Sequence, residues 1–395
     1  MAAFAAADLI PLLFCKYSPA HWFFPFGISF LTFQSLGYIA DVFKKKIEPQ
    51  KNLLDLSLFI SFFPTVSSGP IQRAGNLIPQ FQQAHSFDYK NSSDGMKLFA
   101  WGMFKKLLIA DRIALYVNCV YGNLEGAGSL ALMLATALYL FQIYCDFSGF
   151  SDMAIGAARY LGFDAGKNFD HPLLSQSVGE FWRRWHISLS SWLRDYVYIP
   201  LGGSRVALPR IYLNLIITFL VSGMWHGSTW GFALWGILHG VYLCGERAAR
   251  PIKEKIKIPA WINIPVTFCL VSFSLVFFRA VTLRDAFFAA KKILLWPQDL
   301  ARFFQLKGDL GFLGAVKTIF SFTDASFGYF SGILTMFGLL LLFCVLSIMT
   351  FKKDGLSLVA EQKPVVRILL YMALVCMILF LTPNSYSTNF IYQNF

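Results

Sequence analysis

His226 is the side chain that the sequence places best to act as a base. It lies in segment 222–227, inside a run of 35 residues (211–245) without Asp, Glu, Lys or Arg. Ionisable side chains at membrane depth are costly and usually face a cavity, a pathway or a site. A neutral histidine in a dry pocket can take a proton from an alcohol. The alternative is an imidazole hydrogen-bonded between helices, and the residues alone leave both interpretations open.

A second histidine, His186, lies in a segment rich in Trp and Arg. At helical spacing His186 flanks an apolar stripe that consists of Trp182, Trp185, Leu189 and Trp192. This pattern favours an amphipathic helix at the membrane interface with snorkelling arginines. The alternative is a basic, aromatic mouth, in which arginines bind the phosphates of a thioester carrier. Its arginines would be Arg183, Arg184 and Arg194.

Two carboxylates, Asp146 and Asp152, interrupt the apolar stretch 129–161. Their spacing places them on opposite faces of a helix, so we do not expect a carboxylate dyad. Polar contacts between helices, or a partner for a buried Arg, are the favoured role. His239 follows His226 by thirteen residues and could share its face of a continuous helix. For His239 a packing role is favoured.

Other chemistries find no support in the motifs. No two histidines are spaced as a short metal-ligand pair, and neither a P-loop nor a GxSxG elbow occurs. The seven cysteines are scattered and form no CxxC pair. We therefore expect neither a metal site nor a bound cofactor, and mechanisms with an intramembrane histidine base remain.

The composition defines the environment in which these side chains act. Of 395 residues, 56% are hydrophobic and only 14% charged, against about 25% charged in soluble domains. This excludes a soluble globule, a disordered chain and a coiled coil. The formal charge of +12 is explained by basic cytoplasmic loops and not by nucleic-acid binding. We predict an all-α, multi-pass integral membrane protein with a single domain over residues 1–395.

Apolar stretches long enough to cross or enter a bilayer recur along the chain: 22–43, 53–66, 98–121, 129–161, 211–245, 261–278, 332–351 and 366–381. The stretch 53–66 is short and predicts a re-entrant or interfacial element. Lys105-Lys106 and Asp111-Arg112 interrupt 98–121, which predicts a helix partly in the interface. The break at 227–231 predicts a bend or a hairpin, because one straight helix would be too long. Residues 300–327 are expected to form a semi-polar loop, and residues 1–10 the end of a helix that begins upstream.

Several motifs resemble the membrane-bound O-acyltransferase (MBOAT) family, and within it the alginate O-acetyltransferase (AlgI-like) branch. The strongest are YCDFSGFSDMAIG at 144–156, FWRRWHISL at 181–189 and WHG at 225–227. Supporting matches lie at 27–30, 32–34, 69–71, 168–169 and 198–205. The resemblance implies a multi-helix fold with a central funnel and tunnel. It also implies that N-terminal helices of the family are missing before residue 27.

The resemblance assigns roles to individual residues. His226 matches the catalytic histidine, and His186 the second characteristic histidine. His239 matches a further histidine of the branch. We expect substrate contacts from Arg183, Arg184, Trp185, Trp225, Asp146, Asn214 and His239.

The implied reaction moves an acyl group, acetyl in this branch, from a cytoplasmic thioester such as acetyl-CoA to a hydroxyl. The acceptor would be an exported polysaccharide or an extracytoplasmic acyltransferase partner, at a bacterial inner membrane. Alternatives are D-alanyl transfer to teichoic acid from an acyl carrier protein and an inactive scaffold. A different class is a proton-coupled transporter or flippase in which His226 and Asp146 relay protons.

Overall fold

The computed structural model describes residues 9–13, 27–256, 258–321, 330–351 and 355–382, and the described chain is helical without β-strands. An all-α membrane protein, as predicted, is confirmed. The N-terminal part comprises α2 (Ile28–Phe43), α3 (Leu53–Ile60), α4 (Ala74–Phe81), α5 (Tyr89–Met103), the π-helix η1 (Phe104–Ala110), α6 (Asp111–Gly122) and α7 (Ser129–Tyr160). The prediction for residues 1–10 lies largely outside the described residues.

The second half continues with short helices and then longer ones. The short group comprises η2 (Pro172–Leu174), α8 (Val178–Arg184), α9 (Ile187–Leu193) and the π-helix η3 (Arg194–Tyr198). The others are α10 (Leu208–His226), α11 (Trp230–Ala248), α12 (Arg250–Lys255), α13 (Ala260–Arg279), α14 (Leu283–Ile293), α15 (Trp296–Ile319), α17 (Phe330–Met349), α18 (Gly355–Ala360) and α19 (Pro364–Leu381).

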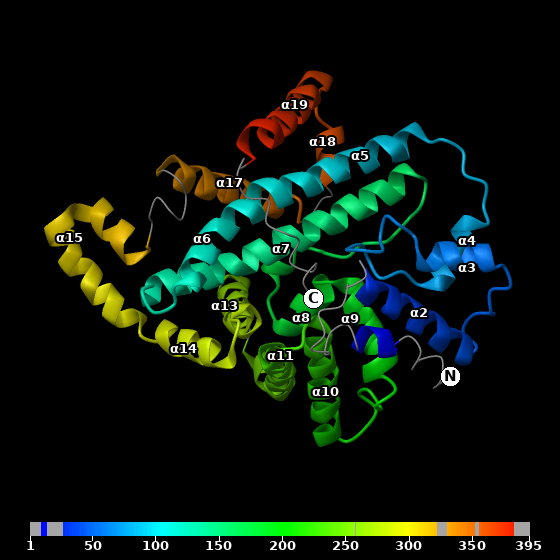
Figure 1. Ribbon diagram of the computed structural model, residues 1–395, viewed down its shortest axis with the longest axis horizontal. Helices are drawn as coiled ribbons and strands as arrows, with labels where there is room; N and C mark the ends of the chain where they lie inside the picture. Colours follow the sequence, from blue (N-terminus) through cyan, green and yellow to red (C-terminus); the bar gives the residue numbers. More distant parts are fainter. Residues whose placement is uncertain (1–8, 14–26, 257, 322–329, 352–354, 383–395) are drawn as a thin grey trace.

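The long helix α7 is the centre of the fold, and α5, η1 and α6 run antiparallel along it (Figure 1). The two backbones meet at pairs of glycines. A Cβ atom on Gly102 would lie 2.5 Å from the carbonyl oxygen of Gly149, and one on Gly95 would lie 2.6 Å from that of Gly156. Small residues at a helix interface allow this close approach, which is common between membrane helices.

The glycine contact predicts that the same substitution, Gly to Ala, has different effects at two positions. Gly102→Ala is expected to lower the free energy of unfolding by about 1–3 kcal/mol, because the new methyl group overpacks the interface. Gly122→Ala is the matched control, since no atom lies within 4 Å of its added Cβ. It should be neutral or slightly stabilising, because Ala is the better helix former. Thermal unfolding midpoints in detergent would test this, and equal effects would contradict it.

The prediction that the helix at 98–121 lies partly in the interface is wrong. Lys105 and Lys106 are buried in η1, and so is Asp111 at the start of α6. Lys105 Nζ lies 2.8 Å from Asp152 Oδ2, and Lys106 Nζ lies 2.8 Å from both Asp146 Oδ1 and Asp111 Oδ1. The charges are therefore paired against α7 and do not face the interface. Both aspartates pair with neighbouring lysines of η1, so they do not lie on opposite faces of α7 as predicted. Each meets a different lysine, and their partners are lysines and not an arginine.

Of the two alternatives predicted at 227–231, a bend or a hairpin, the structure shows the hairpin. Helix α10 ends at His226, α11 starts at Trp230, and the two helices pack against each other. Glycines again bring the backbones together, since a Cβ on Gly223 or Gly236 would lie 2.2 Å from a carbonyl oxygen of the other helix. His239 therefore does not share one continuous helix with His226.

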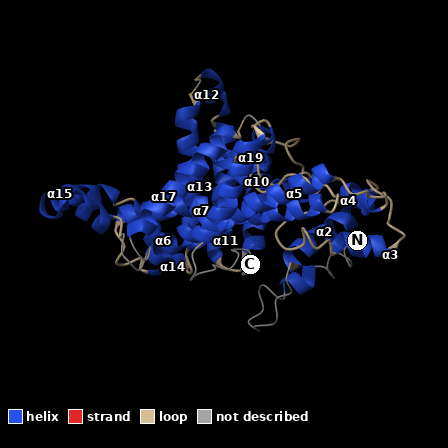
Figure 2. Cartoon of the chain, turned by 90° about the horizontal axis from the view of Figure 1, so that it is seen from above, coloured by secondary structure: helices blue, strands red, loops and turns tan. Residues whose placement is uncertain are grey.

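Other elements depart from the predictions in informative ways. Residues 300–319 of the predicted loop belong to α15, in which Gly311 (φ 71°) forms a kink. Residues 322–327 of that prediction lie outside the described residues. Helix α15 extends away from the rest of the molecule (Figure 2). Stretch 53–66 contains only the eight-residue helix α3, which is too short to span a bilayer, as predicted.

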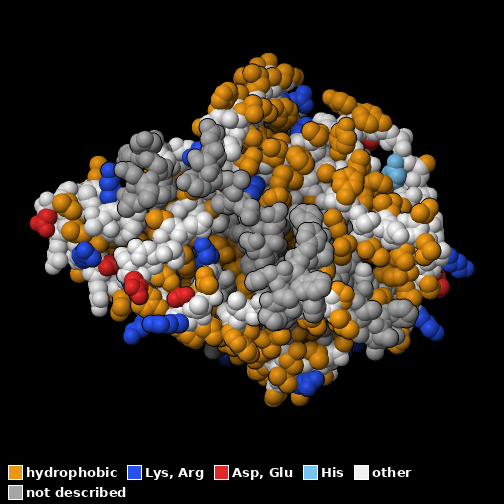
Figure 3. Space-filling view, viewed as in Figure 1, with side chains coloured by type: hydrophobic (Ala, Val, Ile, Leu, Met, Phe, Trp, Pro, Cys, Tyr) orange, Lys and Arg blue, Asp and Glu red, His pale blue; other side chains and the backbone are white. Residues whose placement is uncertain are grey.

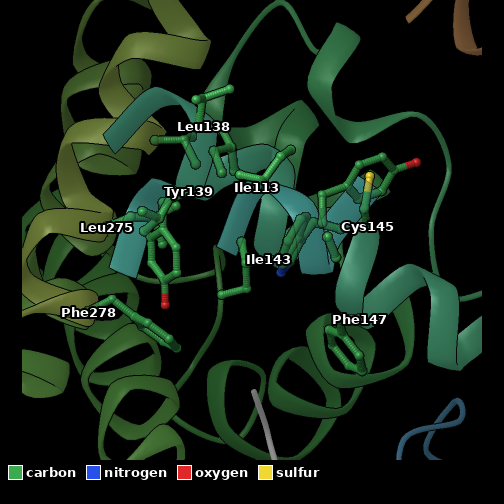
Figure 4. Packing of buried hydrophobic residues seen from close by; sticks show 14 of the residues in the cluster. Ile113, Leu138, Tyr139, Ile143, Cys145, Phe147, Leu275 and Phe278 are labelled. Atoms are coloured by element: carbon green, nitrogen blue, oxygen red, sulfur yellow. The ribbon is translucent and has the colours of Figure 1, made fainter. Parts of the chain in front are cut away.

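Five described helices are long and apolar enough to cross a membrane: Ser129–Tyr160, Leu208–His226, Ala260–Arg279, Gly332–Met349 and Pro364–Leu381. Their outer faces are correspondingly apolar. Hydrophobic side chains cover broad areas of the surface between scattered charged ones (Figure 3). In the interior, side chains of α6, α7 and α13 meet in one cluster, which includes Ile143, Leu275 and Phe278 (Figure 4). These three side chains also line the cavity of the candidate site.

Candidate active site

A narrow cavity lies where α7, α8, α10, α11 and α13 converge. Its lining consists of Leu140, Ile143, Phe181, Trp182, Trp185, His226, Trp235, His239, Val271, Leu275 and Phe278. The walls are mostly aliphatic and aromatic, and few polar atoms enter them. Apolar pockets with a few placed polar groups are the usual form of small-molecule sites. Three predicted site residues, His226, His239 and Trp185, are among the lining.

His226 is the last residue of α10 and only 3% of it is exposed. Its ring lies edge-on to Trp235 on α11, at 5.1 Å between centroids, and to Phe278 on α13, at 5.4 Å. The close α10–α11 contact brings His226 and Trp235 together, because it holds the end of one helix against the start of the other. His226 therefore lies at the cavity wall in aromatic surroundings.

His239 also lines the cavity, but hydrogen bonds engage both of its ring nitrogens. The indole Nε1 of Trp182 donates to His239 Nδ1 at 3.1 Å, and an indole N–H can only donate. The proton must then be on Nε2, which lies 2.9 Å from Ser274 Oγ. Ser274 donates its own proton to the carbonyl oxygen of Val271 at 2.7 Å, so it accepts from His239. The lone pair of His239 is occupied, which favours the packing role.

This network predicts a mild effect of His239→Gln. A glutamine amide can accept from Trp182 and donate to Ser274, so we expect a loss of about tenfold or less in acyl-transfer rate, equivalent to one weakened hydrogen bond. The measurement is the initial rate at equal membrane levels of protein. A loss as large as that of the corresponding His226 variant would show that His239 itself takes part in the reaction.

His186 lies outside the cavity lining, in a break between two short helices. The continuous amphipathic helix predicted over 181–192 is wrong, because α8 ends at Arg184 and His186 is left-handed (φ 43°) before α9. Segment 168–170 lies across the break and provides hydrogen-bond partners for its backbone groups. Ile187 N donates to the carbonyl oxygen of Asn168, and Asp170 N donates to that of Arg184, both at 2.9 Å. Protein also covers the apolar stripe, all of whose members are buried.

The surroundings of His186 are aromatic. Phe147 lies edge-on to its ring at 4.6 Å between centroids, and Trp225 lies at 6.2 Å. Trp225 is also 4.7 Å from the ring of His226, so one indole contacts both histidines. Burial lowers the pKa of His186 to about 3, so its imidazole is neutral near pH 7.

The remaining predicted site residues lie away from the cavity wall. Arg183 is exposed, whereas Arg184 pairs with Glu180 at 2.8 Å and donates to the carbonyl oxygen of Asp170. Asn214 is buried early in α10, where its Nδ2 donates to the carbonyl oxygen of Gly203 at 3.2 Å. Asp146 belongs to the ion pairs with η1. Their substrate contacts stay predictions.

Trp235 is a cavity-lining residue that the sequence analysis did not single out. It is buried, lines the cavity beside His226, and its Nε1 has no hydrogen-bond acceptor among the described residues. Buried donors normally find a partner, so a free one beside a histidine is available to a ligand. A hairpin at 227–231 would have indicated this residue, because the end of its first helix, at residue 226, then lies near residue 235 of its second helix.

The fold and the cavity define a polytopic helical membrane protein with a buried, histidine-bearing site. Residues 40–280 match the model of MBOAT, the membrane-bound O-acyltransferase family. The match covers more than half of the chain. The chain belongs to the membrane-bound O-acyltransferase family, and the resemblance predicted from the motifs is confirmed.

Curated relatives agree with this assignment. The chain is 42% identical over 266 residues to "Probable alginate O-acetylase AlgI" of Azotobacter vinelandii, covering 67% of this chain and 52% of the relative. It is 35% identical over 301 residues to a peptidoglycan O-acetyltransferase of Helicobacter pylori, covering 68% and 56%. It is 29% identical over 306 residues to a teichoic acid D-alanyltransferase of Bacillus subtilis, covering 69% and 75%. The chain thus spans about half the length of the two O-acetyltransferases.

Proposed function

We propose that the protein transfers an acetyl group from a cytoplasmic thioester, such as acetyl-CoA, to a hydroxyl of an exported polysaccharide or of an extracytoplasmic acyl-relay partner. The membrane would be the inner membrane of a bacterium. The observation that carries the proposal is His226, buried at the wall of an apolar cavity in a chain of this family. The relatives named as O-acetyltransferases support acetyl as the acyl group.

In the proposed reaction His226 acts as the base. Its neutral imidazole accepts the proton of the acceptor hydroxyl while the hydroxyl oxygen attacks the thioester carbonyl carbon. The carbon–sulfur bond then breaks, and the leaving thiolate takes the proton back from the imidazolium. The indole N–H of Trp235 can donate to the carbonyl oxygen as negative charge develops on it. The apolar walls exclude water, which would otherwise compete with the acceptor.

His186 is proposed as the second catalytic histidine. It is neutral, fully buried and separated from His226 by the single indole of Trp225. In this arrangement it would act beside the cavity and not in its wall. The wide aromatic surface around both histidines is suited to hold an acyl thioester without competing for their protons.

The test is the O-acetyl content of the surface polysaccharide in a deletion strain. The strain is complemented with this chain, with its His226→Gln variant or with an empty vector, at matched membrane levels of the two proteins. Restoration by the parent alone supports the proposal. A parent that restores no ester-linked acyl group would contradict it.

D-alanyl transfer is the second candidate, favoured by the similarity to the teichoic acid D-alanyltransferase. The same samples distinguish it, because released D-alanine in place of acetate would identify the other acyl group. A transporter or flippase would move its substrate without any new ester bond. Measuring esters and transport together therefore separates the classes.

A further inference from the structure

Asn168 is a fully buried residue outside the cavity whose side-chain amide is hydrogen-bonded at both ends. Its Oδ1 accepts from the backbone N of Ser188 at 3.3 Å and from Ser188 Oγ at 2.9 Å. Its Nδ2 donates to Ser151 Oγ on α7 at 3.1 Å. A backbone N–H can only donate, so the atom that faces Ser188 must be the oxygen. The network therefore fixes which way the amide points.

The same oxygen decides where the proton of His186 is held. His186 Nδ1 lies 3.2 Å from Asn168 Oδ1 and 3.4 Å from Ser188 Oγ, whose own proton is donated to Asn168. Both oxygens can only accept in this arrangement, so Nδ1 carries the proton. A neutral imidazole has one proton, and Nε2 is then the nitrogen with the lone pair.

The Nε2 atom of His186 is buried and has no hydrogen-bond partner among the residues that the structure describes. Phe30, Phe147 and Trp225 surround the ring and offer no conventional donor facing it at hydrogen-bond distance. A buried acceptor without a donor costs free energy and needs an explanation, such as a ligand that supplies one. An Nε2–H tautomer would instead leave Nδ1 facing two acceptors.

We propose that Asn168 is a positioning residue that holds His186 as the Nδ1–H tautomer and leaves Nε2 as its reactive nitrogen. The inference rests on the proposed function, because it assigns the reactive atom of the second histidine in that reaction. Both parts of Asn168 serve this purpose. Its carbonyl oxygen accepts from Ile187 N and holds the break that orients His186, while its amide oxygen sets the proton.

The tautomer can be measured without turnover. The full chain, labelled with ¹⁵N-histidine and placed in lipid bilayers, gives distinct nitrogen signals for protonated and unprotonated ring positions. The signals of His186 are those lost in His186→Gln. We expect the parent to show a protonated Nδ1 and an unprotonated Nε2. A parent with the proton on Nε2 overturns the proposal, whatever the variants do.

Two variants test the positioning role. Asn168→Leu keeps the approximate volume and removes the acceptor, so we expect a mixed tautomer signal and a fall of about tenfold or more in kcat, the equivalent of one buried hydrogen bond, with KM little changed. Ser151→Ala is the matched control, since it removes a buried hydrogen bond of the same amide without touching Oδ1. It should keep the parent tautomer and kcat within about threefold.

The outcomes separate this inference from the proposed function. Parent-like tautomer and kcat in Asn168→Leu overturn the positioning role. An equal fall of kcat in both variants, with the tautomer unchanged, also overturns it, because general loss of packing would then explain the rates. The expected tautomers in a parent that transfers no acyl group would overturn the proposed function and support the assignment of the proton.

Discussion

His226→Gln is expected to abolish acyl transfer, with kcat falling by about 10²–10⁴-fold, the usual contribution of a positioned general base. Glutamine retains a polar side chain of similar length, so the loss would arise from the missing basic nitrogen and not from an empty space. His226 is 3% exposed and lies among the rings of Trp225, Trp235 and Phe278, so water cannot readily replace its function.

The measurement is the initial rate of radiolabelled acetyl incorporation by membranes with equal amounts of protein. His239→Gln is the matched control, because it is the same substitution in the same cavity at a residue whose two nitrogens are already hydrogen-bonded. A His226→Gln rate within about threefold of the parent would remove this residue as the base.

Lys106→Met is expected to cost about 3–5 kcal/mol in the free energy of unfolding, because it leaves buried carboxylates without their cation. Lys106 Nζ lies 2.8 Å from both Asp111 and Asp146, and these three side chains are 9%, 4% and 2% exposed. The methionine fills the space of the lysine stem but supplies no charge. The thermal unfolding midpoint in detergent, together with the level of folded protein in membranes, measures the effect.

Lys46→Met is the control for the loss of a lysine. Lys46 Nζ lies 3.5 Å from Asp41, but its side chain is 52% exposed, so we expect at most about 1 kcal/mol. Adding Asp111→Asn and Asp146→Asn to Lys106→Met should recover part of the stability, because fewer charges are then left buried alone. Equal losses in Lys106→Met and Lys46→Met would contradict the argument.

The sequence predicts the features that depend on local patterns. Helix α7 follows from a long and mostly apolar stretch, and the α10–α11 hairpin follows from a charge-free run too long for one span with glycines in its middle. His226 could be singled out for the same reason. These features require only the length and composition of one segment.

The features that could not be predicted depend on partners far away in the chain. Lys105 and Lys106 resemble interfacial charges until Asp146 and Asp152 are placed beside them. The helical pattern around His186 is real, but segment 168–170 supplies hydrogen bonds that stabilise a break there. His239 has the same side chain as His226, and only the positions of Trp182 and Ser274 show that its nitrogens are engaged.

The ion pairs between η1 and α7 have a consequence for how the chain is made. Helix α6 separates η1 from α7 and only a short turn joins α6 to α7, so the lysines leave the ribosome shortly before their aspartates. Without their partners, neither the lysines of η1 nor the aspartates of α7 can enter the hydrocarbon core without a large free-energy cost. We therefore expect the two segments to integrate together as one antiparallel unit, with the first retained until the second has been synthesised.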